Sequence, residues 1–170
     1  MNDKPPSNYK LISDINNYYE DLLGYSVEKT KLNSLNETQW NSFCNKYNLN
    51  KNSSGIYLPR NQTAIIPINN SLSLFHEYFG HGLYCEQSLS GRNLIDLENK
   101  LLKEEKQEFQ NRQFSLEEIQ KFREKNQTFK ELREFENKNL GLYEGFAIFS
   151  EYFLSKEFNL KDSFEKNMNL

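Results

Sequence analysis

SLSLFHEYFGHGLYCEQ, residues Ser71–Gln87, contains both histidines of this 170-residue chain, His76 and His81, with Glu77 directly after the first. Histidines that bind one metal ion from the same helix usually stand four residues apart, whereas here the interval is five. At about 100° per residue, five positions on a regular α-helix diverge by about 140°, so the two side chains would face different sides. A π-bulge adds one residue to a turn and restores nearly the relation of a four-residue interval. Gly80 relaxes such a bulge most easily, and we predict a widened turn between His76 and His81.

The length and composition of the chain fit one compact domain over residues 1–170. Only 36% of the residues are apolar, but 13 Phe and 10 Tyr supply large side chains for a core. The net charge of -3 comes from interspersed acidic and basic residues, which leaves no basic face for nucleic acid.

No apolar run approaches the roughly 20 residues of a membrane span and the start has no apolar leader, so we expect a cytoplasmic protein without membrane contact. Cys44 and Cys85 are too few and too far apart for a zinc knuckle, and we expect reduced, packed thiols.

Before the histidine stretch, the pattern predicts two helices and two strands. Apolar residues recur at helical spacing over 9–23 and 37–47, and Asn36 is placed to cap the second helix. GIYLP and TAIIPI, residues 55–59 and 63–68, have the composition of two short strands. The second strand ends just before the histidine helix, and we expect its edge to pair with an extended peptide.

After the histidine stretch, the chain is helical in pattern, with the first helix ending at about Ser88 before a break at SGRN. Charged residues at helical spacing predict two helices, 94–111 and 115–137, which form a hairpin insert at about 92–138. The simplest interpretation of this insert is a solvated, coiled-coil-like excursion without chemistry. A final apolar helix over 139–158 is expected to belong to the core. The whole pattern predicts an α+β fold, mainly helical, with a sheet of two or three strands beside the histidine helix.

A third ligand for a metal at the histidines must be a carboxylate, because the chain has no third histidine. Catalytic zinc takes three protein ligands and keeps a fourth position open. The segment LYEGFAIFSEYF places Glu144 and Glu151 in an otherwise apolar helix, about 20° apart, so both point to one side. Such carboxylates are compensated when one binds zinc and the other accepts a hydrogen bond from a ligand histidine. The alternatives are acids that reach the surface and two ordinary helix histidines.

Two motifs resemble those of gluzincin zinc peptidases. HEYFGH resembles the His-Glu-x-x-Gly-His motif of dipeptidyl peptidase III, whose active-site helix carries the same additional residue. YEGFAIFSEYF is similar to the Asn-Glu-Gly-Phe-Ala segment of aminopeptidase N-type enzymes, in which the glutamate is a zinc ligand. The resemblance implies a zincin-like metallopeptidase domain that binds Zn2+ and hydrolyses peptide bonds. The residues it implies are the zinc ligands His76, His81 and Glu144, the general base Glu77, and Glu151 as the acid beside a ligand histidine.

The chain departs from these families at several points. Dipeptidyl peptidase III has a further acid four residues after its ligand glutamate, where this chain has Ile148, and Glu151 is the substitute, as in the aminopeptidases. The Gly-x-Met-Glu-Asn motif that binds the substrate N-terminus in the aminopeptidases is missing, and both families are several times larger. We therefore expect a reduced zinc-dependent peptidase that uses a metal-activated water and acts on a peptide or protein.

Two other functions stay open. One is a zinc-binding, catalytically weak or inactive peptidase-like module that acts in interactions through the charged hairpin at about 92–138. The other is a metal-free helical protein in which His76, His81, Glu77 and Glu144 are all structural. A peptidase also needs a group that stabilises the oxyanion, and the sequence selects none of its Tyr or Arg residues for that role.

Overall fold

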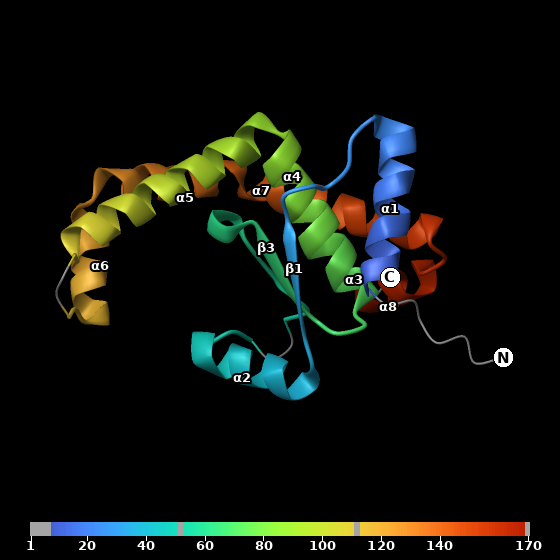
Figure 1. The fold of residues 1–170 in the computed structure, drawn as a ribbon, viewed down its shortest axis with the longest axis horizontal. Helices are drawn as coiled ribbons and strands as arrows, with labels where there is room; N and C mark the ends of the chain where they lie inside the picture. The colour runs from blue at the N-terminus through green and yellow to red at the C-terminus, as the bar shows by residue number, and fades with distance from the viewer. Residues whose placement is uncertain (1–7, 51–52, 111–112, 169–170) are drawn as a thin grey trace.

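The structure is a computed structural model that describes residues 8–50, 53–110 and 113–168. It is mainly helical with one three-stranded sheet (Figure 1), which confirms the predicted α+β class. The elements in chain order are α1 (Asn8–Leu23), β1 (Lys31–Leu35), α2 (Glu37–Tyr47), β2 (Ile56–Leu58), the short 3-10 turn η1 (Pro59–Asn61), β3 (Thr63–Pro67), α3 (Ser71–Ser73), the π-helix η2 (Leu74–Gly82), α4 (Leu83–Gln87), α5 (Leu89–Glu108), α6 (Leu116–Lys125), α7 (Gln127–Glu157) and α8 (Lys161–Met168).

The strands lie in the order β1-β3-β2, with β1 parallel and β2 antiparallel to β3. β3 is therefore the central strand, and the expectation that its edge binds a peptide is wrong because both of its edges are already paired. The sequence does not predict β1, since KLNSL has only two apolar residues. Its extended form comes from pairing with β3, from Lys31 opposite Thr63 to Leu35 opposite Pro67.

The two faces of the sheet are covered by different helices. Successive residues of a strand point to opposite faces. Ile65 of β3 packs with Trp40 and Cys44 of α2, whereas Ala64 and Ile66 join the main core around η2. Figure 1 shows α2 below the strands and the helical run from α3 to α4 to their right. The sheet is thus the layer that separates α2 from the histidine helix.

The two helices predicted before the histidine stretch are confirmed as α1 and α2. The side chain of Asn36 accepts a hydrogen bond from the Gln39 backbone N–H, and the Gln39 side chain accepts one from the Asn36 N–H, so α2 begins with a reciprocal cap. α1 places Ile15 and Tyr19 in the main core, where the Tyr19 ring meets Phe79 of η2 edge to face.

Beyond the histidine helix the structure corrects the predicted boundaries. α5 begins at Leu89, so SGRN lies in the first turn of a helix and does not break one. The chain turns at Ser88 instead, because its hydroxyl accepts a hydrogen bond from the Gly91 N–H and caps α5. The helix end predicted at Asn111 falls outside the described residues. The second predicted arm is divided at Asn126, which ends α6 and caps α7.

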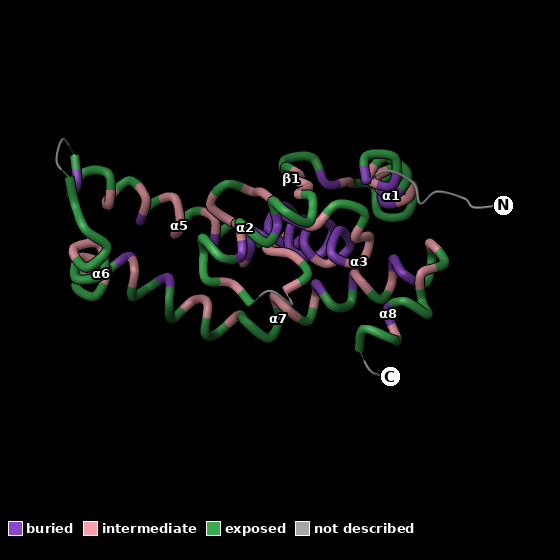
Figure 2. The backbone as a smooth tube through the Cα atoms, turned by 90° about the horizontal axis from the view of Figure 1, so that it is seen from below, coloured by how far each residue is buried: buried purple, intermediate pink, exposed green. Residues whose placement is uncertain are grey.

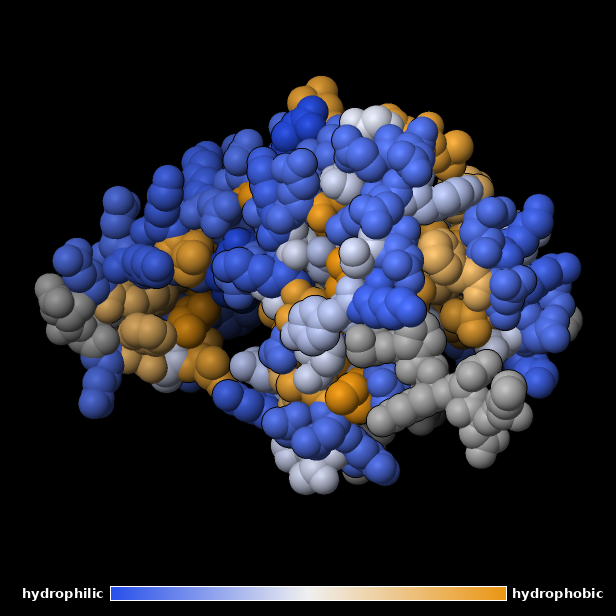
Figure 3. Space-filling model, turned by 45° about the vertical axis from the view of Figure 1, so that its right-hand side comes forward, coloured by the Kyte–Doolittle hydropathy of each residue, from blue (hydrophilic) through white to orange (hydrophobic). Residues whose placement is uncertain are grey.

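α7 is one helix of 31 residues, so the second arm and the predicted final apolar helix are continuous. Gly141 and Gly145 lie within it, but a glycine costs only about 1 kcal/mol in a helix interior, too little to end a helix that packs along η2. Figure 2 shows the buried residues in the centre and α5 and α7 extending away to α6. At the α6 end, Figure 3 shows apolar surface. Phe114 and Leu116, around the start of α6, are exposed large apolar residues.

η2 passes through the main core. Leu74, Phe75 and Phe79 of this element have almost no solvent-exposed surface. Tyr19 of α1 contacts Phe79, and Phe158 at the end of α7 contacts Phe75, so packing buries most of η2, whereas the side chain of His76 stays partly exposed. None of the helices in the described ranges combines the length and apolarity needed to cross a membrane.

Candidate metal centre

The predicted widening of the helix between the two histidines is confirmed. η2 is a π-helix of nine residues, longer than a single bulge, and it contains both His76 and His81. Its hydrogen bonds join residues five apart, so side chains at this interval lie one above the other on the same side. The two imidazole centroids are 4.9 Å apart as a result. The interval of five therefore brings the histidines together.

Glu144 of α7 lies across both histidines. Its carboxylate oxygens are 3.7 Å from Nε2 of His76 and 3.8 Å from Nε2 of His81. One ligand atom from each of the three residues lies within 4.8 Å of the others, so this group could hold a metal ion. Ligand atoms on a tetrahedral zinc ion with bonds of about 2.0–2.1 Å are about 3.4 Å apart, so small side-chain shifts would close the group around an ion.

Gly80 explains how α7 comes this close to η2. A Cβ atom at Gly80 would lie 2.6 Å from the Cα of Ala147 and 2.9 Å from its Cβ, so the two helices touch through these small residues. Ala147 is fully buried and stands one helical turn after Glu144. The contact between Gly80 and Ala147 therefore sets the distance of the Glu144 carboxylate from the histidines.

Each histidine is oriented by a different neighbour. Nδ1 of His76 lies 3.0 Å from an oxygen of Glu151, a hydrogen bond in which the ring nitrogen donates and which leaves Nε2 facing Glu144. The ring of His81 stacks on Tyr143 at 4.0 Å between centroids and 21° between planes. Nδ1 of His81 is buried without a hydrogen-bond partner in the described part of the chain. Its Nε2 lies 3.8 Å from Glu144, beyond hydrogen-bond distance, so this nitrogen can serve as a metal ligand.

Glu77 is buried beside the first histidine, with 6% of its surface exposed. Its side chain packs against Gly55, where an added Cβ would lie 2.7 Å from the Glu77 Cγ. Burial and the nearby carboxylates of Glu144 and Glu151 raise the pKa of Glu77 to about 7, although the charge of His76 and a backbone N–H of Tyr57 lower it. A carboxylate with this pKa can take up and release a proton near neutrality.

The electrostatics of the group favour a cation. Burial lowers the pKa of His76, but the carboxylates of Glu144 and Glu151 outweigh burial and raise it to about 10. Burial and the charge of His76 lower the pKa of His81 to about 3, so this ring is neutral. His76 in turn holds the pKa of Glu144 below its usual value. The surplus of carboxylates around two imidazoles suits a divalent ion.

All five residues that the sequence singles out come together in space. They are His76, Glu77, His81, Glu144 and Glu151. Sequence reasoning misses Gly55, Tyr143 and Ala147. Tyr143 directly precedes Glu144, but in a chain with 10 Tyr nothing marks it, and the other two act through contacts between distant segments.

Comparison of the chain with protein-family models, with curated proteins and with solved structures finds no match. The likeness to gluzincins therefore rests on the two sequence motifs alone. The roles of the five residues and the identity of the metal stay predictions.

Proposed function

We propose that this chain is a zinc-dependent peptidase, a reduced gluzincin that hydrolyses peptide bonds in a peptide or protein substrate. The observation that carries the proposal is the position of the Glu144 carboxylate, 3.7 and 3.8 Å from the two histidines. These separations are too long for hydrogen bonds and close to those of ligands that share one ion.

The three candidate ligands and the adjacent carboxylate of Glu77 favour hydrolysis. Two imidazoles and one carboxylate form the protein ligands of several catalytic zinc sites. The chemistry that such a centre supplies is Lewis acidity, which polarises a carbonyl and lowers the pKa of water. The same donors hold Fe(II) in some oxygenases. Glu77 favours hydrolysis, because that reaction needs a proton acceptor beside the ligands, and this buried carboxylate directly follows His76.

The residues of the chain then have separate tasks. A carboxylate oxygen of Glu77 accepts the proton of the attacking water and later donates it to the leaving amine. Glu151 accepts the hydrogen bond from Nδ1 of His76 and so keeps its Nε2 available for a ligand bond. Tyr143 holds the plane of the His81 ring by stacking.

A substrate can reach this group from one side. The side chain of Glu144 is 44% exposed and that of His76 20%, whereas His81 is buried beneath them. Among the strands of the described ranges, β2 pairs only with β3, and Tyr57 of β2 interacts with Glu77 through its backbone N–H. An extended peptide paired with the free edge of β2 would therefore lie beside the general base. In this proposal β2 binds the peptide, a role that the sequence suggests for β3.

Metal content and cleavage, measured on the same preparations, test this proposal. Zinc, iron and manganese are quantified by mass spectrometry in protein purified without chelators, and cleavage is followed with a mixed library of quenched fluorescent peptides. The variants are His81→Ala, Glu77→Gln and, as a control for the same chemical change on exposed α7 surface, Glu134→Gln. We expect one zinc per chain in all proteins except His81→Ala, and cleavage only by the wild type and Glu134→Gln.

Each departure from this result has a defined meaning. Iron in place of zinc, or no metal, contradicts the zinc assignment. Stoichiometric zinc retained by His81→Ala contradicts the ligand assignment. Zinc without cleavage in the wild type contradicts the peptidase and favours a zinc-binding interaction module.

A further inference from the structure

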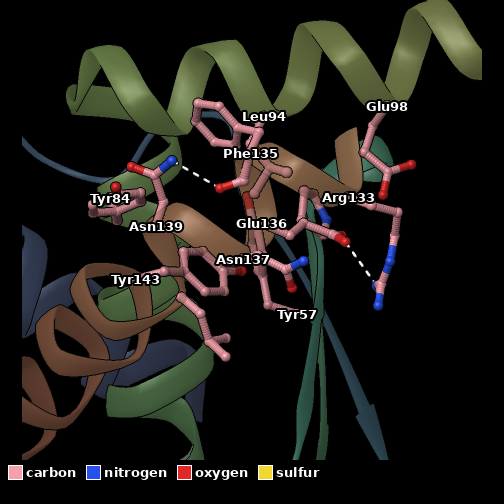
Figure 4. Close-up of a pocket in the computed structure, with 12 residues that line it drawn as sticks. Tyr57, Tyr84, Leu94, Glu98, Arg133, Phe135, Glu136, Asn137, Asn139 and Tyr143 are labelled. Carbon is pink, nitrogen blue, oxygen red and sulfur yellow. Dashed lines mark hydrogen bonds and ion pairs between the residues drawn. The ribbon is translucent and has the colours of Figure 1, made fainter. Parts of the chain in front are cut away.

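A cavity of about 380 Å3, open to solvent on one side, lies next to the candidate metal centre and is lined by residues of β2, η1, α4, α5 and α7 (Figure 4). Tyr143 is part of its wall, and the same ring stacks on His81. Leu140, which also lines the cavity, is half exposed and stands four residues before Glu144 on α7. Residues at this spacing are neighbours on a helix surface, with about 5–6 Å between Cβ atoms. The side chains of a substrate on either side of the bond held at Glu144 would thus be within reach of the cavity.

The inner part of the cavity is aromatic. Tyr57, Tyr84, Tyr143 and Leu94 contribute to its lining, and flat aromatic walls favour a flat aromatic occupant. Figure 4 shows Tyr84 and Tyr143 with Asn139 at one end of the cavity. This end lies against α4 and is the deeper one, because Tyr84 is only 5% exposed.

The hydroxyl of Tyr84 is a polar group without a partner at this deep end. It is buried and makes no hydrogen bond within the described part of the chain. The ring lies against Tyr143 and Phe146, 5.5 and 5.8 Å away between centroids, so the position of the hydroxyl oxygen is held by packing. A buried hydroxyl in this state costs free energy, and a ligand that brings a hydrogen-bonding group to it recovers that cost.

The other end of the cavity is charged but neutral in sum. Glu98 pairs with Arg60 of η1 through contacts of 2.8 and 2.9 Å. Arg133 pairs with Glu136 at 2.9 Å, an interaction drawn in Figure 4. Because every charged residue in this lining already has an opposite charge, a charged side chain gains no partner there and loses its hydration.

We infer that this cavity receives a tyrosine side chain of the substrate, with its ring between the aromatic walls and its hydroxyl on that of Tyr84. The inference rests on the proposed function, because it names the substrate of the same centre. The volume is at the lower end of the roughly 300–1,000 Å3 of ligand sites, which suits a side chain better than a cofactor.

Binding of two small probes tests the inference without requiring cleavage. N-acetyl-tyrosinamide and N-acetyl-phenylalaninamide differ by one hydroxyl, and their affinities for the full chain are measured by ligand-observed NMR titration. We expect the tyrosine probe to bind about tenfold more tightly, in line with one additional buried hydrogen bond. Tyr84→Phe should bring the ratio of affinities to about one. Tyr19→Phe, the same change at a buried tyrosine outside the cavity, should leave it at about ten, and thermal unfolding checks that both variants fold.

The outcomes separate this inference from the proposed function. Equal affinities of the two probes in the wild type, no binding of either, or a preference that survives in Tyr84→Phe overturns the tyrosine cavity. A preference that depends on Tyr84 in a protein that cleaves no peptide supports the cavity and overturns only the peptidase. Cleavage of peptides without any effect of tyrosine supports the peptidase and overturns the cavity as its substrate pocket.

Discussion

Two buried carboxylates in the same helical run, Glu86 in α4 and Glu77 in η2, have opposite surroundings. The oxygens of Glu86 accept four hydrogen bonds of 2.7 to 2.9 Å, from the backbone N–H groups of Glu28, Lys29 and Thr30 and from the Thr30 hydroxyl. They tie the segment before β1 to the end of the histidine helix. Glu86 is thus a buried charge with its hydrogen-bonding capacity well used.

Glu77 is equally buried but far less compensated. A Tyr57 backbone N–H and the charge of His76 act in its favour, yet burial still raises its pKa to about 7. A carboxylate in this condition exchanges a proton easily, whereas the hydrogen bonds of Glu86 hold two distant segments of the chain together. The comparison teaches that burial alone does not mark a functional acid. The state of its hydrogen bonds separates the two.

The largest expected effect is a loss of activity when the acidic group of Glu77 is removed. Glu77→Gln removes the proton acceptor but keeps the shape, so we expect kcat/KM for a cleaved peptide to fall by about 10²–10⁴. Stability should be unchanged or higher, because the variant loses a poorly compensated buried charge. Steady-state kinetics and urea unfolding measure the two quantities. A variant with wild-type activity would show that another group accepts the proton.

The second effect is a loss of stability when the hydrogen bonds of Glu86 are weakened. Glu86→Gln keeps one carbonyl acceptor but loses the charge and one acceptor oxygen, so we expect a loss of about 3 kcal/mol in the free energy of unfolding. The melting temperature should fall by about 6–12 °C. The exposed side chain of Glu28 takes no part in the clamp, and Glu28→Gln should stay within about 0.5 kcal/mol. Equal stability of the two variants would contradict the assigned role of Glu86, and zinc content should be unchanged in both.

The contrast between these two acids also measures what the sequence can predict. His76, Glu77 and His81 belong to one short motif, and Glu144 and Glu151 are seven residues apart, which places them on one side of a helix. These local patterns were enough to predict that the five residues form one site. Glu86 lies in the same quoted stretch, yet its partners are backbone N–H groups at least 56 residues away. No side-chain pattern encodes a bond to a backbone group, and this clamp was therefore not predictable.

Other differences have the same origin. α1, α2, β2 and β3 follow from local periodicity, composition and caps, and the sequence predicts them. β1 depends on its pairing with β3, and the continuity of α7 through Gly141 and Gly145 depends on packing against η2. Gly80 was expected to relax the π-bulge, but the structure adds a reason that the sequence could not contain, its contact with Ala147.

The third effect tests that contact. Gly80→Ala would push α7 away from η2, and we expect a loss of about 2 kcal/mol in unfolding free energy together with weaker zinc binding, as for other overpacked core sites. Gly145 is exposed on α7, with nothing within 4 Å of an added Cβ. Gly145→Ala should therefore be neutral or stabilising by up to about 1 kcal/mol, with unchanged zinc affinity. Chemical unfolding and competition with a chromophoric chelator provide the measurements, and equal behaviour of the two variants would refute the role of Gly80 in placing Glu144.

The smallest expected effect concerns a third carboxylate, Glu151, and the affinity for zinc. Glu151 lies between the two cases, because it is half-buried and makes one hydrogen bond, to Nδ1 of His76. Glu151→Gln retains an acceptor oxygen but loses the charge that makes His76 a better ligand, so we expect zinc affinity to fall by about tenfold. Chelator competition measures this change, with Glu134→Gln as the control. A complete loss of zinc would make Glu151 a ligand, and unchanged affinity would mean that packing alone orients His76. A tenfold loss places Glu151 as the residue that links the binding of the metal to the fold of α7.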